Sequence, residues 1–160
     1  MNEYTVTGVY LFDWGDTLMV DLPGQAGKMC DWPEVKTMPG AADTLAHLSQ
    51  TSKIYVATNA VESAPDDIER AFERAGMAQF ISGYFCRANL GIGKGSPSFY
   101  EAILDKLGIE AHQATMVGDS YDNDISPALE AGLHAIWLTA GGNCRCCPDK
   151  VRIIGSLPDI

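Results

Sequence analysis

Short, apolar, β-rich stretches alternate with helical patterns along the chain, and this alternation limits the possible folds more than any other feature. The stretches that we expect to form strands are residues 6–12, 53–57, 81–86, 114–117 and 135–138. The segments that we expect to form helices are residues 41–48, 65–75, 96–107 and 124–131. Strands and helices in alternation predict an α/β fold, a doubly wound, mainly parallel sheet of about five strands with helices on both faces.

Polar side chains follow three of the expected strands at the point where each strand ends. Asp13 follows the first strand, Thr58 follows the second, and Asp119 follows the fourth. In open parallel sheets, ligands bind at the carboxyl ends of the strands. A random scatter of polar residues would rarely produce this placement, so it predicts a functional site at that edge.

Carboxylates dominate this predicted site. Asp119 and Asp124 lie close together in the segment GDSYDND, and Asp13 joins them if the strand ends meet. Three unpaired carboxylates would repel one another strongly without a cation, and hard oxygen ligands suit Mg²⁺. The plainer interpretations stay open: Asp13 as a cap on the following turn, and Asp124 as a charge at a helix N-terminus.

Three further candidates are not acidic. Thr58 and Asn59 supply a hydroxyl and an amide, and Lys94, in the segment GIGKGS, supplies a positive charge. Carboxylates, a cation, a hydroxyl and a lysine together suit phosphoryl transfer, which needs an in-line nucleophile and neutralised charge.

Four segments, in order over residues 9–138, resemble the four motifs of the haloacid-dehalogenase-like (HAD) hydrolases. They are LFDWGDTL, VATNA, Lys94 with the following GSPSF, and VGDSYDND. The resemblance implies that Asp13 attacks phosphorus and forms an aspartyl-phosphate, and that Lys94 neutralises charge between nucleophile and phosphate. It also implies that Thr58, with Asn59 beside it, binds the phosphoryl group.

The same resemblance implies a magnesium site. Its ligands would be Asp13, the backbone carbonyl of Gly15, Asp119 and Asp124. Asp124 would either support the metal shell or orient Lys94. Mg²⁺ is therefore the expected cofactor, and a small phosphorylated compound is the expected substrate.

The first motif departs from the family pattern at Gly15. HAD phosphatases usually have an Asp there, which protonates the leaving group and then activates water. Asp16 stands one step later. Either Asp16 reaches the leaving group through a different backbone turn, or the general acid is missing.

Three functions remain open on this evidence. The favoured one is a Mg²⁺-dependent phosphomonoester hydrolase that uses Asp13. The alternatives are a HAD-like hydrolase of a phosphonate or haloacid, and a non-catalytic domain that binds metal or phosphate. Phosphonate and haloacid relatives normally carry a sizeable cap domain, and the short stretches from Asp13 to Thr58 and from Thr58 to Lys94 leave no room for one.

We expect a single domain over residues 1–160. Residues 19–38, rich in Pro and Gly, are expected to form a small flap in which Trp32 either contacts the substrate or packs over the sheet edge. Residues 140–160 are expected to be an irregular tail. Its cysteines either bind a metal or remain free thiols: Cys144, Cys146 and Cys147.

Composition excludes some classes of function. A formal net charge of −10 disfavours nucleic-acid binding, because an acidic surface repels the phosphate backbone. No apolar run is long enough for a membrane helix, and no signal peptide is expected at the start. We therefore expect a cytoplasmic protein. In a chain without a signal peptide, the odd number of five cysteines favours reduced thiols. A homo-oligomer remains possible.

Overall fold

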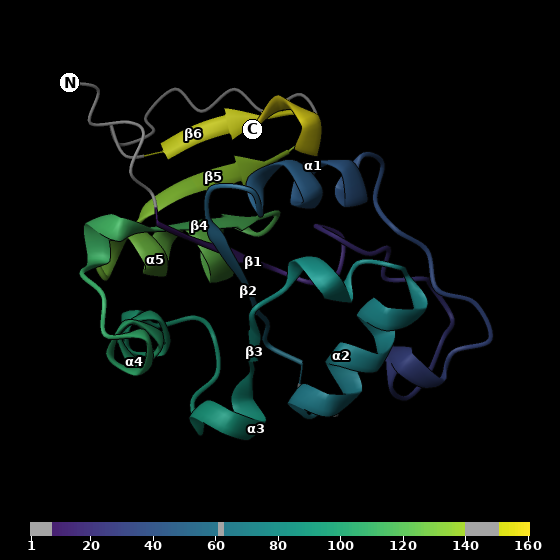
Figure 1. Ribbon diagram of the computed structural model, residues 1–160. Coiled ribbons are helices and arrows are strands. Elements are labelled where there is room, and N and C mark those ends of the chain that lie inside the picture. Colours follow the sequence, from purple (N-terminus) through teal and green to yellow (C-terminus); the bar gives the residue numbers. More distant parts are fainter. Residues whose placement is uncertain (1–7, 61–62, 140–150) are drawn as a thin grey trace.

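The computed structural model describes residues 8–60, 63–139 and 151–160, and a parallel sheet runs through its centre (Figure 1). In these residues the sheet has six strands in the order β3-β2-β1-β4-β5-β6, and every neighbouring pair is parallel. The strands are β1 (Val9–Phe12), β2 (Lys53–Ala57), β3 (Gly83–Phe85), β4 (Ala114–Gly118), β5 (His134–Leu138) and β6 (Val151–Ile154).

The predicted α/β class with a doubly wound, Rossmann-like sheet is confirmed. The strand count is six, not about five, because β6 pairs with β5 along the sheet edge. The expectation of an irregular tail over residues 140–160 is therefore wrong for residues 151–160, which form β6 and a helical turn. The short VRII segment is rich in β-branched residues, which favour a strand. The three tail cysteines lie outside the described residues.

Helices cover both faces of the sheet, as Figure 1 shows, with α4 and α5 on one side and α1 and α2 on the other. The α-helices are α1 (Ala41–Leu48), α2 (Pro65–Arg74), α3 (Arg87–Leu90), α4 (Pro97–Leu107) and α5 (Ser126–Glu130). Shorter turns are 3₁₀ helices at Met29–Asp31, Ala78–Phe80, Ala111–Gln113 and Leu157–Asp159, and a π-helical turn at Tyr121–Ile125.

Successive side chains of β1 point to opposite faces and so join two separate cores. Leu11 packs in the core that contains Phe99 of α4, and Phe12 packs in the core that contains Phe72 of α2. All four side chains are fully buried. The central strand is therefore fixed from both sides, and so is the residue that follows it.

The strand order reverses next to β1, which creates the crevice where such sheets bind ligands. Phe12 of β1 lies beside Val117 of β4, and the backbone N–H of Asp13 donates to the carbonyl of Val117 at 2.9 Å. Asp13 and Asp119 thus emerge from neighbouring strand ends on the same edge of the sheet.

Residues 19–38 leave this edge and run beside α2 before returning to α1 (Figure 1). The two arms pair where Val20 donates to Lys36 at 2.7 Å between backbone atoms. Arg74 of α2 donates to the backbone carbonyls of Cys30 and Trp32 at 3.0 and 2.7 Å. This segment, named the excursion below, is therefore anchored to α2.

Among the described residues, no helix is both long enough and apolar enough to cross a bilayer.

Candidate active site

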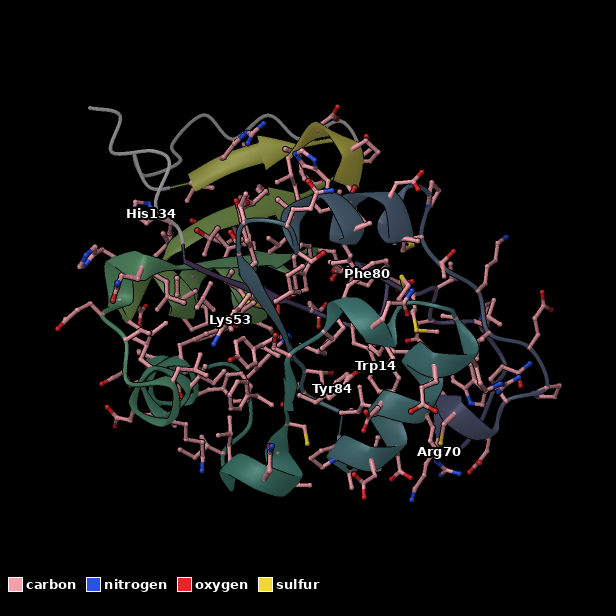
Figure 2. All side chains as sticks on the ribbon, viewed as in Figure 1. Trp14, Lys53, Arg70, Phe80, Tyr84 and His134 are labelled. Carbon is pink, nitrogen blue, oxygen red and sulfur yellow. The ribbon has the colours of Figure 1, made fainter. Side chains whose placement is uncertain are left out.

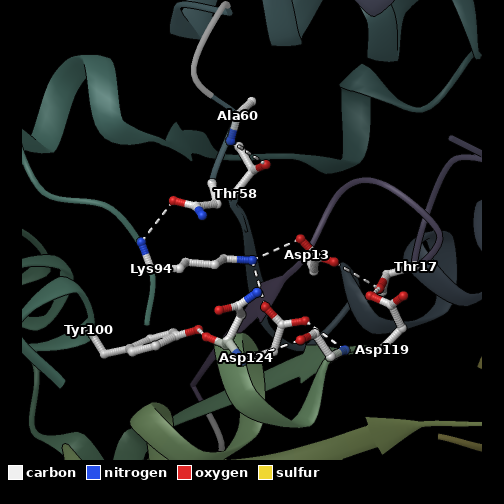
Figure 3. Close-up of polar contacts among 11 residues, drawn as sticks. Asp13, Thr17, Thr58, Ala60, Lys94, Tyr100, Asp119 and Asp124 are labelled. Carbon is white, nitrogen blue, oxygen red and sulfur yellow. Dashed lines mark hydrogen bonds and ion pairs between the residues drawn. The ribbon is translucent and has the colours of Figure 1, made fainter. Parts of the chain in front are cut away.

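A buried lysine joins two aspartates at the carboxyl edge of the sheet (Figure 3). Lys94 Nζ lies 2.8 Å from Asp13 Oδ1 and 2.7 Å from Asp124 Oδ1, and its side chain is 2% exposed. Burial acts to lower the pKa of Lys94, but the charges of Asp13 and Asp124 outweigh burial and raise it. The ammonium group is therefore held in its charged form between two carboxylates.

A third aspartate lies on the other side of Asp13. Thr17 Oγ1 is 3.3 Å from both Asp13 Oδ2 and Asp119 Oδ1, and its single hydroxyl proton can serve only one of them at a time. The pKa of Asp119 is raised to about 7. The largest cause is the burial of its carboxylate, and the hydrogen bond with Asp13 and repulsion by the charge of Asp13 add to it. Among the residues that the structure describes, the ion pairs of this cluster involve Asp13 and Asp124, and none involves Asp119.

The donor set of this cluster suits a divalent cation. Asp13, Asp119 and Asp124 each offer an oxygen, and these atoms all lie within 4.8 Å of one another. Three carboxylates against the single ammonium of Lys94 leave two negative charges, the amount that one divalent cation neutralises. Carboxylate oxygens are also the ligands that Mg²⁺ takes. The raised pKa of Asp119 is consistent with this excess of negative charge, because repulsion by Asp13 and Asp124 contributes to it.

Asp124 is held in place by local structure that the sequence pattern does not reveal. It lies in the π-helical turn, and Asp124 Oδ2 accepts from the backbone N–H of Ser120 at 3.1 Å. A Cβ atom added to Gly118 would lie 2.6 Å from Asp124 Cβ, closer than real atoms approach. The hydroxyl of Tyr100 donates to the carbonyl of Asn123 at 2.9 Å and fixes the turn from α4. Gly118 and Tyr100 thus support the position of Asp124.

Thr58 and Asn59 follow β2 on the same edge of the sheet. Thr58 is buried, and its Oγ1 accepts from the backbone N–H of Ala60 at 3.2 Å. Asn59 Oδ1 accepts from the backbone N–H of Lys94 at 3.0 Å. The side chain of Asn59 therefore holds the backbone at Lys94 in position.

A pocket of about 330 Å³ opens beside Asp13. Its lining residues are Asp13, Trp14, Gly15, Asp21, Gly27, Met29, Trp32, Thr58, Asn59, Ala60 and Ser63. Trp32 is 7% exposed, so it both packs in the core and lines the pocket. Trp14 lies against α2, with its ring centroid 6.2 Å from that of Phe72 (Figure 2). The excursion thus supplies an aromatic wall to the pocket.

The structure brings most of the predicted site residues together. Asp13, Lys94, Asp119 and Asp124 form the cluster, and the pocket beside it is lined by Gly15, Thr58 and Asn59. Asp16 is the exception: it lines a separate cavity of about 250 Å³ with Met38 and Leu138.

Sequence reasoning missed several neighbours of the cluster. They are Thr17, Asp21, Tyr100 and Gly118. Thr17 stood inside the first motif, and Gly118 stood directly before Asp119, so the motifs themselves held a signal for both. No pattern marked Asp21, and the helical periodicity of residues 96–107 indicated Tyr100 only as a core-facing residue.

The fold and the cluster together define a doubly wound α/β protein. Its acidic site, bridged by a lysine, lies where the strand order reverses next to β1. Residues 15–132 match the haloacid dehalogenase-like hydrolase family. The chain therefore belongs to the haloacid dehalogenase-like hydrolases, and the resemblance read from its four motifs is confirmed.

Two curated relatives and one solved structure show how far the similarity extends. The chain is 28% identical over 109 residues to the phosphoserine phosphatase of Thermus thermophilus, which covers 68% of this chain and 44% of that protein. It is 40% identical over 50 residues to the phospholysine phosphohistidine inorganic pyrophosphate phosphatase of Mus musculus, which covers 31% of this chain and 18% of that protein. The chain thus spans less than half the length of either relative.

The crystal structure of an uncharacterized protein from Listeria monocytogenes serotype 4b superposes with a TM-score of 0.82 at 24% sequence identity. The match covers 95% of this chain and 93% of that chain. At this identity the likeness shows the fold.

Proposed function

We propose that this chain is a Mg²⁺-dependent phosphomonoester hydrolase that forms an aspartyl-phosphate on Asp13. The observation that carries the proposal is the buried ammonium of Lys94, held 2.8 Å from Asp13 Oδ1 and 2.7 Å from Asp124 Oδ1. A nucleophilic carboxylate must approach a phosphoryl group that is itself negative, and a fixed cation beside the nucleophile reduces that repulsion.

In the proposed reaction an oxygen of Asp13 attacks phosphorus while the bond from phosphorus to the leaving oxygen breaks. Thr58, at the end of β2, hydrogen-bonds the phosphoryl oxygens from the pocket side. Lys94 neutralises charge between the nucleophile and the phosphoryl group. Water then attacks the aspartyl-phosphate and releases phosphate, which regenerates the carboxylate.

The metal would be held by Asp13, Asp119 and the backbone carbonyl of Gly15, with Asp124 contributing its charge while it orients Lys94. Both oxygens of Asp124 already have partners, Lys94 Nζ and the N–H of Ser120, which supports this orienting role. When bound, Mg²⁺ supplies the charge neutralisation that the carboxylates lack.

The substrate class is a small phosphorylated compound. A pocket of about 330 Å³ lies at the low end of the range for small-molecule sites. The two curated relatives are named as phosphatases, which supports the same bond type. The aromatic wall from Trp32 suits the apolar part of such a substrate.

The test begins with release of inorganic phosphate from a panel of small phosphomonoesters, with Mg²⁺ and with EDTA. We expect release by the wild type only with Mg²⁺, and no release by Asp13→Asn. Asp105→Asn, the same change at an exposed position of α4, is the matched control and should retain activity.

A second measurement identifies the nucleophile. With Mg²⁺, beryllium and fluoride, we expect a beryllofluoride adduct on Asp13 by mass spectrometry or ¹⁹F NMR. A wild type that releases no phosphate from any ester of the panel would end the proposal, and an adduct on another residue would end the assignment of Asp13.

A further inference from the structure

The pocket holds an acidic side chain that no motif marks. Among the described residues, two carboxylates line it: Asp13, the proposed nucleophile, and Asp21. Asp21 belongs to the excursion, eight positions along the chain from Asp13, and it is an exposed residue that lines the pocket. It is therefore accessible to a substrate that binds there.

Asp21 lies beside the position that the first motif leaves without an acid. A Cβ atom added to Gly15 would have Asp21 Cβ as its nearest neighbour, at an ordinary contact distance of 3.6 Å. A side chain at position 15 and the side chain of Asp21 would therefore occupy adjoining space. Asp21 therefore lines the pocket next to the place where a side chain at position 15 would begin.

The neighbouring Asp16 holds Asp21 there. Asp16 has a φ of 59°, the left-handed region that Asp and Asn adopt more readily than other side chains. This turn folds the chain back, so that the backbone N–H of Asp16 donates to Met19 at 2.6 Å. Asp16 Oδ1 in turn accepts from the backbone N–H of Asp21 at 3.0 Å.

We propose, resting on the function proposed above, that Asp21 is the general acid and base of the reaction and that Asp16 is its positioning residue. In the first step Asp13 forms its bond to phosphorus, the bond to the leaving oxygen breaks, and the carboxyl proton of Asp21 passes to that oxygen. The leaving group departs as a neutral alcohol.

In the second step the Asp21 carboxylate takes a proton from water as the water oxygen attacks phosphorus. The bond from phosphorus to Asp13 breaks, phosphate leaves, and Asp21 is protonated again. The net change is one ester and one water consumed, and one alcohol and one phosphate formed. No further reactant is needed.

Asp16 does not fit the acid role itself. It lines the separate cavity with Met38 and Leu138, and one of its carboxylate oxygens is engaged by the N–H of Asp21. Its charge is directed at the backbone of the excursion, whereas Asp21 lines the cavity that contains Asp13.

The test uses leaving groups of different quality. For Asp21→Asn we expect kcat/KM to fall roughly 10²–10⁴-fold with an alkyl phosphate, whose alkoxide needs a proton to leave. With p-nitrophenyl phosphate the fall in kcat/KM should be less than about tenfold, because nitrophenolate leaves without protonation. A burst of about one nitrophenolate per enzyme should then precede a slow steady state, since the second step also needs Asp21.

Four further variants separate position from chemistry. Restoring an acid at position 15, as Gly15→Asp with Asp21→Asn, should recover at least about tenfold of the lost kcat/KM on the alkyl phosphate. Gly15→Asn with Asp21→Asn, of the same shape without the proton, should not. Asp16→Ala should lose activity selectively on the alkyl phosphate, and Asp16→Asn, which keeps an acceptor oxygen, should rescue that loss.

The inference fails if Asp21→Asn lowers kcat/KM equally for both esters, or lowers it only for substrates that carry a positive charge. It also fails if Asp16→Asn loses as much as Asp21→Asn, since Asp16 would then be the acid. Asp13→Asn must be inactive in the same assays. An inactive Asp13→Asn beside an unaffected Asp21→Asn would refute Asp21 alone and leave the proposed function standing.

Discussion

Replacement of Lys94 by Met tests whether the buried bridge contributes to stability as well as to chemistry. Met keeps most of the side-chain volume and removes the charge. The change leaves Asp13, whose side chain is 14% exposed, and Asp124, whose side chain is 1% exposed, without their common partner. Asp13 can regain water, but Asp124 keeps only the N–H of Ser120.

The size of the effect follows from the burial of Asp124. Removing one partner of a buried ion pair costs about 3–5 kcal/mol, because the other charge stays buried. Since Asp13 is partly rehydrated, we expect the lower end, about 3 kcal/mol at pH 8 without metal. For a chain of this length, 1 kcal/mol shifts Tm by roughly 2–4 °C, so the variant should melt about 6–12 °C below the wild type.

The loss of stability in Lys94→Met should depend on pH. Burial raises the pKa of Asp124, and Lys94 opposes that rise. Without Lys94 the folded-state pKa rises further, so the variant loses stability as pH increases above the unfolded value near 3.8. The deficit in Tm should therefore grow from pH 5 to pH 8, and excess Mg²⁺ should recover part of it.

The assay is thermal unfolding by circular dichroism in EDTA at both pH values. Lys53→Met is the control, because Lys53 is exposed at the opposite end of β2 from the site (Figure 2). That control should change stability by no more than about 0.5 kcal/mol. If Lys94→Met melts within about 2 °C of the wild type at pH 8, the bridge does not stabilise the fold and the reasoning is wrong.

Three other predictions test the surroundings of the site. Gly118→Ala should destabilise the fold by about 1–3 kcal/mol and abolish phosphate release, because the new methyl group displaces Asp124, whereas Gly155→Ala, where an added Cβ meets nothing within 4 Å, should melt like the wild type. Arg74→Ala should raise KM several-fold in steady-state assays and lower kcat more with an alkyl phosphate than with p-nitrophenyl phosphate, because it frees the excursion that walls the pocket and carries Asp21. The raised pKa of Asp119, about 7, means that the metal-free protein loses stability as pH rises from about 4 through 7 and that protons compete with Mg²⁺ below 7. The gain in Tm on adding Mg²⁺ should therefore be larger at pH 8 than at pH 5.5, and equal gains would contradict this assignment.

The sequence was sufficient for the layout of the fold wherever turn signals and periodicity agreed. The helix at Ala41–Leu48 and the strand at Lys53–Ala57 have the predicted bounds. The predicted helix at 124–131 is divided into the π-helical turn and α5, because Pro127 lacks an N–H and suits the first turn of a new helix. Strand β6 was missed because four β-rich residues after a Gly- and Cys-rich stretch carry no periodicity long enough to be recognised.

The candidate site divides in the same way. Asp13, Asp119 and Thr58 could be predicted because strand ends in a parallel sheet meet at one edge, whatever the intervening chain does. Asp21 could not, because its position depends on a left-handed turn at Asp16 and on backbone pairing within the excursion. Such contacts are tertiary, and no spacing rule encodes them.

This division bears on how the chemistry would vary. The nucleophile is fixed by strands packed on both faces, so changes in the excursion should leave the position of Asp13 unaltered. The proposed acid is carried by the excursion. Arg74 of α2 holds the excursion at Trp32, and the side chain of Asp16 holds its backbone at Asp21. Variation in the excursion should therefore alter which leaving groups are accepted before it alters whether an aspartyl-phosphate forms. The two halves of the reaction would then depend on separate parts of the structure, one rigid and one adjustable.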